Sequence, residues 1–231
     1  MIINDHQKMY ESMKELKSWG YIDPIGYSSG SIEDYYRTCC LSVTKKAKDD
    51  YIENRLHIEP SMVGTFYYYM FMKKKIPNQV EYIVFYFAIH NEWVKHHVGK
   101  EYHEAFVGRL SRFYPSMLRD VHFYHVLKES DAFQKTLFVL KYDIEAKVDC
   151  FVKRKGSWYG IQLRTKTKRS NEFYEKKKFR NAMNVKAKLI DLPIDLKKAR
   201  SLPTKKDSIK LYGREHVLLL TDIIGEENGI A

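Results

Sequence analysis

Residues 147–164 read KVDCFVKRKGSWYGIQLR, and this stretch decides the fold. Alternating apolar residues lie on both sides of Lys155-Gly156, a pair that is typical of a two-residue hairpin turn. Pairing about that turn places Arg154 opposite Ser157. The pattern therefore predicts an antiparallel hairpin with its residues sorted onto two faces.

The two faces of this hairpin are predicted to differ sharply in polarity. One face carries Lys147, Asp149, Phe151, Gly160, Gln162 and Arg164, and the other carries Val148, Cys150, Val152, Tyr159, Ile161 and Leu163. The second face is almost wholly apolar and is the predicted core face. A slip of one residue would set Asp149 against an apolar position instead of Gln162, so the pattern supports this register.

The polar face has two interpretations. It is either an ordinary solvated surface with an ion pair between Asp149 and Arg164, or a site for a metal ion and a phosphate. The Asp149 carboxylate and the Gln162 carbonyl are hard oxygen ligands that suit Mg²⁺ or Mn²⁺. Arg164 and Lys166 would lie beside a bound phosphodiester.

The elements around the hairpin indicate a mixed fold. Helices are expected over Asn4–Trp19, from a Ser31 cap through Leu56, over Ser61–Lys75, from Pro77 to about His97, over 101–112, and from Pro115 to Glu129. Strands are expected over Phe133–Leu140, Val185–Leu192 and Glu215–Thr221, a basic helix from Ser170 to Met183, and a polar loop over Leu196–Asp207. We predict a helical module over 1–100 and a mixed α/β module over 101–231.

From Pro115 onward, the predicted order is helix, three strands, helix, strand. With Asp149 on the second strand and Gln162-x-Arg164 on the third, this part of the chain resembles the PD-(D/E)XK, or restriction-endonuclease-like, nucleases. The resemblance covers about residues 100–222 and implies an αβββαβ core with a mixed sheet. It implies that Asp149 binds the metal and that Gln162 replaces the usual acid, as in some members. It also implies hydrolysis of DNA phosphodiester bonds with Mg²⁺ or Mn²⁺.

The resemblance also implies an acid on the helix before the first strand, for which Asp120 is the first candidate, Glu104 the second and Glu129 the third. Arg164 departs from the family, which has lysine at that position. Arginine stays protonated and cannot act as a general base, although it can stabilise charge on a phosphate. Lys166 is the residue that could substitute.

The segment after the hairpin is predicted to bind the nucleic-acid backbone. A helix N-terminus offers free backbone N–H groups to a phosphate, and hydroxyls and cations lie around it. The residues assigned to this contact are Thr165, Thr167, Lys168, Arg169, Ser170, Lys177 and Arg180. The alternative is a basic surface helix capped by Ser170.

The charge distribution points to the same region. The 231-residue chain has a formal net charge of +11, and residues 151–210 hold 19 Lys+Arg against 5 Asp+Glu, a net of +14. This excess favours a nucleic-acid partner. The three cysteines and the absence of a leader or a long apolar run favour a cytoplasmic protein with no membrane contact.

Two other functions stay open. Arg164 and Gln162 also fit a nuclease-fold protein that binds DNA without cutting it, as a regulator or partner subunit. The tyrosine-rich region 63–93 could be an interface for a homodimer or a heteromeric partner. Leu56–Phe71 could form a helix-turn-helix, although packing of its tyrosines in the core is the stronger interpretation.

Overall fold

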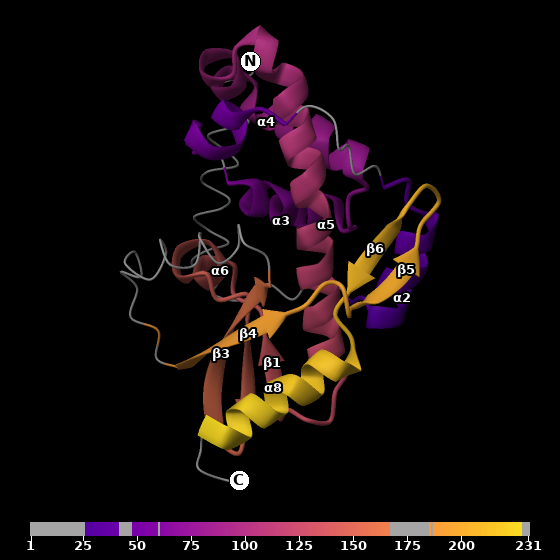
Figure 1. Cartoon of the computed structure of the whole chain (residues 1–231), viewed down its shortest axis with the longest axis vertical. Coiled ribbons are helices and arrows are strands. Elements are labelled where there is room, and N and C mark those ends of the chain that lie inside the picture. The colour runs from indigo at the N-terminus through magenta and orange to yellow at the C-terminus, as the bar shows by residue number, and fades with distance from the viewer. Residues whose placement is uncertain (1–25, 42–47, 60, 167–184, 186, 228–231) are drawn as a thin grey trace.

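The computed structural model describes residues 26–41, 48–59, 61–166, 185 and 187–227. The helices predicted over Asn4–Trp19 and Ser170–Met183 lie outside these residues. The described chain is mixed α and β, with helices in the upper half of Figure 1 and a four-stranded sheet in the lower half. No helix among the described residues combines the length and the apolar character that a membrane span requires.

The first half of the described chain is helical. Its elements are α2 (Ser29–Thr38), the π-turn η1 (Tyr51–Arg55), α3 (Met62–Lys73), α4 (Gln79–His97), the 3₁₀ turn η2 (Lys100–Tyr102) and α5 (His103–Lys128). The predictions for α3 and α4 are confirmed, with Ser61 and Asn78 as their N-caps. The prediction for α2 is wrong at both ends: Ser28 is the cap, Ser31 closes the capping box, and the helix ends at Thr38.

Helix α5 is a single helix of 26 residues, where the sequence predicted two. Pro115 lies inside it, and because proline has no N–H, the carbonyl of Ser111 one turn earlier loses its helical donor. The buried Gln79 side chain replaces that donor, with its Nε2 2.9 Å from the Ser111 carbonyl oxygen. A long-range side-chain hydrogen bond therefore lets the helix continue through the proline.

Replacing Gln79 with alanine should lower the free energy of unfolding by about 1–3 kcal/mol, because it leaves the buried Ser111 carbonyl without a donor. Urea denaturation measures this change. The control is Val80→Ala, at the next residue of α4, whose side chain is 65% exposed and should change stability little. Equal stabilities of the two variants would contradict the role of Gln79.

The sheet has the order β1-β2-β3-β4. Its strands are β1 (Lys135–Leu137), β2 (Cys150–Arg154), β3 (Ser157–Thr165) and β4 (Lys188–Ile194). The first three run antiparallel to their neighbours, and β3 and β4 are parallel. The predicted hairpin is confirmed: Arg154 lies opposite Ser157, and Lys155 and Gly156 have φ of 48° and 82°, both left-handed.

Several other boundaries differ from the prediction. The strand predicted from Phe133 is only three residues long, and helix α6 (Leu140–Ala146) follows it. Strand β4 continues through Pro193, which is tolerated because β4 is an edge strand of the described sheet. The loop predicted over Leu196–Asp207 contains strand β5 (Arg200–Pro203), which forms a hairpin with β6 (Ser208–Leu211).

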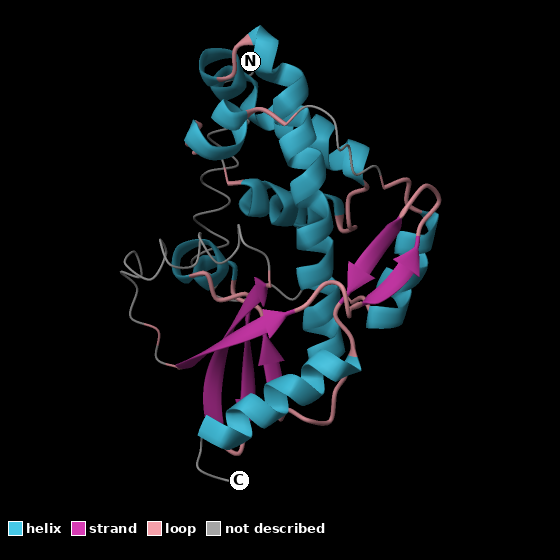
Figure 2. Ribbon diagram, viewed as in Figure 1, coloured by secondary structure: helices cyan, strands magenta, loops and turns pink. Residues whose placement is uncertain are grey.

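The last predicted strand is a helix, α8 (Arg214–Glu227). Its buried residues Val217, Leu220 and Ile224 recur at helical spacing, whereas Leu218 and Leu219 are exposed. The apolar run at residues 217–220 is too short for periodicity to separate a strand from a helix. Helix α8 crosses one face of the sheet, as Figure 2 shows.

One contiguous core joins all these elements. Buried apolar side chains from α2 to α5, from the sheet and from α8 belong to a single cluster. The boundary predicted near residue 100 falls between α4 and α5, and the core extends on both sides of it. A smaller cluster on the opposite face of the sheet includes Val139, Ala146, Val148 and Phe151.

The tyrosines of α3 and α4 lie inside the main body of the chain. Tyr67, Tyr68, Tyr69, Tyr82 and Tyr86 are all buried. Their burial supports the core-packing interpretation over a recognition helix, which would have to present its side chains to DNA. It also removes these tyrosines from any surface through which a partner or a second copy could bind.

Candidate functional site

Asp149 lies at the point where β2 begins and the chain leaves α6. Helix α6 ends at Ala146, and its C-cap residue Lys147 has a left-handed φ of 59°. The Asp149 amide N donates to the Ile161 carbonyl at 2.8 Å, and its Oδ2 accepts the Leu163 N–H at 2.6 Å. Two hydrogen bonds to β3 therefore fix both the backbone and the carboxylate of Asp149.

The predicted face assignment is wrong for the first residues of the hairpin. The pairing of β2 with β3 ends at Cys150 opposite Ile161 and does not extend to Lys147. A Cβ atom built on Gly160 would lie 3.1 Å from Val148 Cγ1, so Val148 packs on the face of Gly160 and not with Cys150. The strand alternation on which the prediction depended therefore holds only from Cys150 onward, where the pairing begins.

Asp120 and Asp149 are brought within electrostatic reach of each other. Asp120 lies on α5, two turns before the end of that helix. Burial and the neighbouring Asp149 carboxylate raise the pKa of Asp120 well above its ordinary value, and Arg119 opposes this only partly. The neighbouring Asp149 carboxylate thus disfavours ionisation of Asp120, and a cation between the two would relieve that cost.

Sequence reasoning missed a third acid near this pair. Burial raises the pKa of the Tyr67 phenol and of the Cys150 thiol. The negative charges of Asp143 on α6, Asp120 and Asp149 raise both pKa values further. Helix α6 was not predicted, so nothing in the sequence placed Asp143 near the hairpin. Among the described residues, however, no three His, Cys, Asp or Glu side chains are arranged to hold a metal ion by themselves.

Gln162 and Arg164 follow Asp149 along β3 and contact other groups. The Gln162 Nε2 lies 3.3 Å from the Ala146 carbonyl oxygen at the end of α6. Arg164 forms an ion pair with Asp191 of β4, with Nε and Oδ2 3.0 Å apart and both side chains about three-quarters buried. The register of β3 and β4 places Asp191 directly opposite Gln162.

Asp191 is the second acid that the sequence reasoning missed. It interrupts the alternating apolar residues of β4, where Ile190, Leu192 and Ile194 face the main core. A charged residue at the outward position of a predicted strand was the available signal. Its partner could be identified only from the parallel pairing of β3 with β4.

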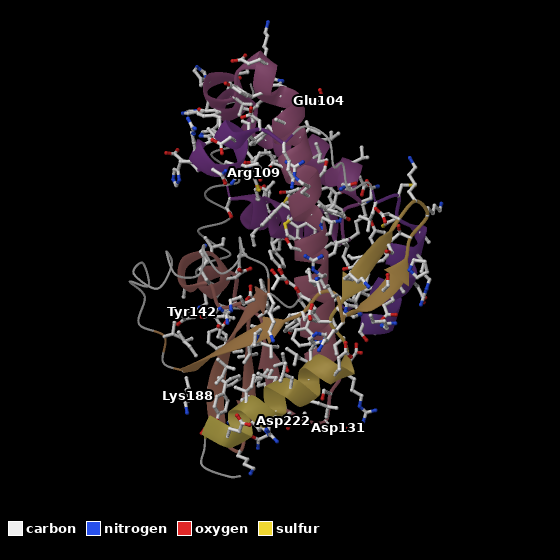
Figure 3. All side chains as sticks on the ribbon, viewed as in Figure 1. Glu104, Arg109, Asp131, Tyr142, Lys188 and Asp222 are labelled. Carbon is white, nitrogen blue, oxygen red and sulfur yellow. The ribbon has the colours of Figure 1, made fainter. Side chains whose placement is uncertain are left out.

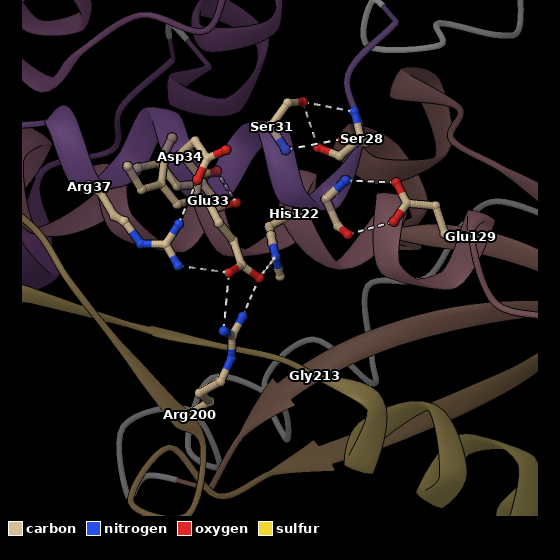
Figure 4. A network of polar contacts seen from close by, with 12 residues as sticks. Ser28, Ser31, Glu33, Asp34, Arg37, His122, Glu129, Arg200 and Gly213 are labelled. Atoms are coloured by element: carbon tan, nitrogen blue, oxygen red, sulfur yellow. Dashed lines mark hydrogen bonds and ion pairs between the residues drawn. The ribbon is translucent and has the colours of Figure 1, made fainter.

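The other two candidate acids lie elsewhere. Glu104 is in the first turn of α5, about 24 Å from Asp120 along the helix axis, and Figure 3 shows it at the end remote from the sheet. Glu129 accepts two hydrogen bonds from Ser29, from its N–H at 2.7 Å and from its Oγ at 2.5 Å, and so anchors the start of α2 (Figure 4). Of the three candidates, only Asp120 is near Asp149.

The predicted phosphate-binding residues are only partly described. Thr165 ends β3, opposite Ile194 of β4. The Lys166 N–H donates to the Ile194 carbonyl at 2.7 Å, and the residue is exposed at the end of the sheet. The others lie outside the described residues: Thr167, Lys168, Arg169, Ser170, Lys177 and Arg180.

The candidate site is thus formed by Asp149 at the start of β2, Asp120 on α5, Gln162 and Arg164 on β3, and Asp191 on β4. Comparisons of the chain with protein-family models, with curated proteins and with solved structures found no match.

Proposed function

We propose that the protein binds DNA and hydrolyses its phosphodiester bonds with the help of Mg²⁺ or Mn²⁺. The observation that carries this proposal is the pair formed by Asp120 and Asp149, two acids from different elements that lie close enough to raise the pKa of Asp120. Acids whose pKa is strongly perturbed by desolvation and by a charged neighbour are a recurrent feature of functional sites.

The donors around this pair fit a magnesium ion. Mg²⁺ commonly binds one or two carboxylates and keeps several water molecules, so Asp120, Asp149 and the Gln162 carbonyl form a sufficient set. When bound, the metal would polarise the phosphate and lower the pKa of a water molecule. The element order α5, β1, β2, β3 and β4 supports a nuclease-like core, with α6 as an addition between β1 and β2.

The neighbouring cations have separable roles in this proposal. Arg164 is held by Asp191, and its guanidinium group would stabilise negative charge on the phosphate. Lys166, exposed just after β3, is the second cation placed to contact the phosphate. The +14 charge of residues 151–210 supports a polyanionic substrate.

A protein that binds DNA without cutting it is the second candidate function. The ion pair of Arg164 with Asp191 and the hydrogen bond of Asp149 to the Leu163 N–H favour it, because both side chains already have structural partners. The two candidates predict the same DNA affinity and differ in their response to metal.

Incubation of supercoiled plasmid with the protein separates these candidates. We expect nicked and linear products with Mg²⁺ or Mn²⁺ and none with EDTA, together with calorimetric binding of Mg²⁺ to the protein alone. Retention of DNA on a gel, with neither cleavage nor metal binding, would favour the second candidate. A protein that neither binds nor cuts DNA would contradict both.

A further inference from the structure

We infer that the β5–β6 hairpin is a docking surface for duplex DNA on the carboxyl side of the sheet. This inference deepens the proposed function, because it names the form of the substrate and a second contact beyond the acid pair. It depends on four exposed lysines: Lys197 and Lys198 lie just before β5, and Lys205 and Lys206 lie in the turn between β5 and β6.

The side chains of these four lysines form no ion pair with a carboxylate in the described part of the chain. The nearest acids are used locally: Asp195 Oδ1 accepts the Lys197 N–H at 2.9 Å, and Asp207 Oδ1 accepts the Ser208 N–H at 2.8 Å. Unneutralised cations on one small hairpin repel each other, and a phosphate backbone removes that repulsion.

The hairpin that presents these lysines is firmly attached to the body of the protein. Its inward residues Leu202, Ile209 and Leu211 are buried in the main core. Arg200 reaches Glu33 of α2 with both terminal nitrogens, and the buried His122 of α5 contacts the same carboxylate, as Figure 4 shows. A duplex would therefore meet a preorganised surface, so little ordering entropy is lost on binding.

The turn at the end of the hairpin is also fixed. The Thr204 N–H donates to the Asp207 carbonyl at 2.8 Å, and the Asp207 N–H donates to Thr204 Oγ1 at 3.1 Å. The Lys205 N–H donates to the Cys39 carbonyl at 3.1 Å, which ties the turn to the end of α2. These bonds use the backbone and leave the lysine side chains of the turn exposed.

The hairpin lies on the same side of the sheet as the candidate site. Strand β4 ends at Ile194, opposite Thr165, and the chain then leads directly into β5 (Figure 1). Lys197 and Lys198 follow that strand end by three and four residues, at most about 10–14 Å away. Lys205 is seven residues further, so at most about 25 Å beyond Lys198.

Lys198 and Lys205 therefore lie within about 25 Å of each other, which is less than one turn of duplex, and successive phosphates on one strand of B-DNA are about 3.4 Å apart along the axis. A rigid surface with two separated lysine pairs matches a regular duplex better than a single strand, which binding sites commonly hold by stacking its bases on aromatic side chains. The outward positions of the hairpin carry serine, proline and lysine, with no aromatic side chain. The inference therefore commits to double-stranded DNA.

The test measures binding of the full-length protein to a 20-base-pair duplex in EDTA, where no cleavage occurs, over a range of salt concentrations. The variants are Lys197→Ala/Lys198→Ala and Lys205→Ala/Lys206→Ala. The matched control is Lys73→Ala/Lys100→Ala, which changes two exposed lysines at the end of α3 and in η2 that, like the hairpin lysines, form no ion pair among the described residues. We expect the slope of log affinity against log salt to fall by about 0.9 for each phosphate contact removed, and no change in the control.

Loss of at least tenfold in duplex affinity at moderate salt, for both hairpin variants and not for the control, supports the inference. Wild-type affinity of the hairpin variants, an equal loss in the control, or an equal loss on single-stranded DNA of the same sequence would overturn it. The proposed cleavage is tested separately. Equal nicking by wild type and Asp149→Asn would contradict catalysis by the acid pair, but it would not change the binding result for the hairpin.

Discussion

Replacing Asp149 with asparagine is expected to slow metal-dependent nicking of supercoiled plasmid by about 10²–10³-fold or more, because the metal loses its central carboxylate while the phosphate still requires charge stabilisation. Asparagine keeps an oxygen that can accept the Leu163 N–H, so the fold at the start of β2 should survive. Initial rates of plasmid nicking at saturating Mg²⁺ measure the effect. The same loss is expected with Asp149→Ala, at a greater cost to stability.

The control for that experiment is Asp131→Asn. Asp131 is exposed in the turn after α5, at the end of the molecule opposite to Glu104, as Figure 3 shows. This substitution removes one negative charge without touching the candidate site. If both variants nick DNA at the wild-type rate, Asp149 is a structural residue whose carboxylate only satisfies the β3 backbone.

Replacing Asp120 with asparagine should make the metal-free protein more stable at alkaline pH. The pKa of Asp120 is raised in the folded state, so the folded protein holds the proton more tightly than the unfolded chain. Its contribution to stability is fully present below the unfolded pKa of about 4, and it is lost as the pH rises through the folded pKa. Asparagine carries no charge and does not impose this loss.

Magnesium should instead make the wild-type protein more stable than Asp120→Asn. At a metal concentration of about 100 times its dissociation constant, the wild-type protein should gain about 2.7 kcal/mol of stability, and Asp120→Asn should gain much less. Urea denaturation of both proteins at pH 5, 7 and 8.5, with Mg²⁺ and with EDTA, provides the comparison. Identical pH profiles without metal, or an identical gain with metal, would show that Asp120 neither carries the raised pKa nor binds the ion.

The parts of the fold that were predictable from the sequence depend on local patterns. The Lys155-Gly156 turn and the alternation of β2 and β3 determined the register from Cys150 to Arg154, and Ser61 and Pro77 marked the approximate starts of α3 and α4. Each of these signals acts within a few residues, where turn and capping chemistry dominates.

The errors arose where distant contacts override the local signal. Pro115 was predicted to begin a helix, because proline is common in the first turn of helices. The helix instead continues through it, because Gln79, 36 residues away in the sequence, replaces the missing hydrogen-bond donor. Residues 217–220 were predicted to be a strand from their short apolar run. Packing against the sheet shows instead that Val217, Leu220 and Ile224 share one face of a helix.

The residues of the candidate site also divide into those that the sequence indicates and those that only the structure shows. Asp149 was identified from its strand, and Asp120 from a resemblance that requires an acid on the preceding helix. Asp191 and Asp143 could not be found, because the parallel pairing of β4 and the presence of α6 are tertiary features. Arg164 was recognised as a departure from the family, but its ion pair with Asp191 is visible only in the structure.

The most direct test of the central claim is a crystal of the protein soaked in Mn²⁺, with the ion located by its anomalous scattering. We expect one strong peak between the carboxylates of Asp120 and Asp149 and within ligand distance of the Gln162 carbonyl oxygen. A map with no peak there, and with the Asp149 carboxylate bonded to the Leu163 N–H as it is without metal, would contradict it.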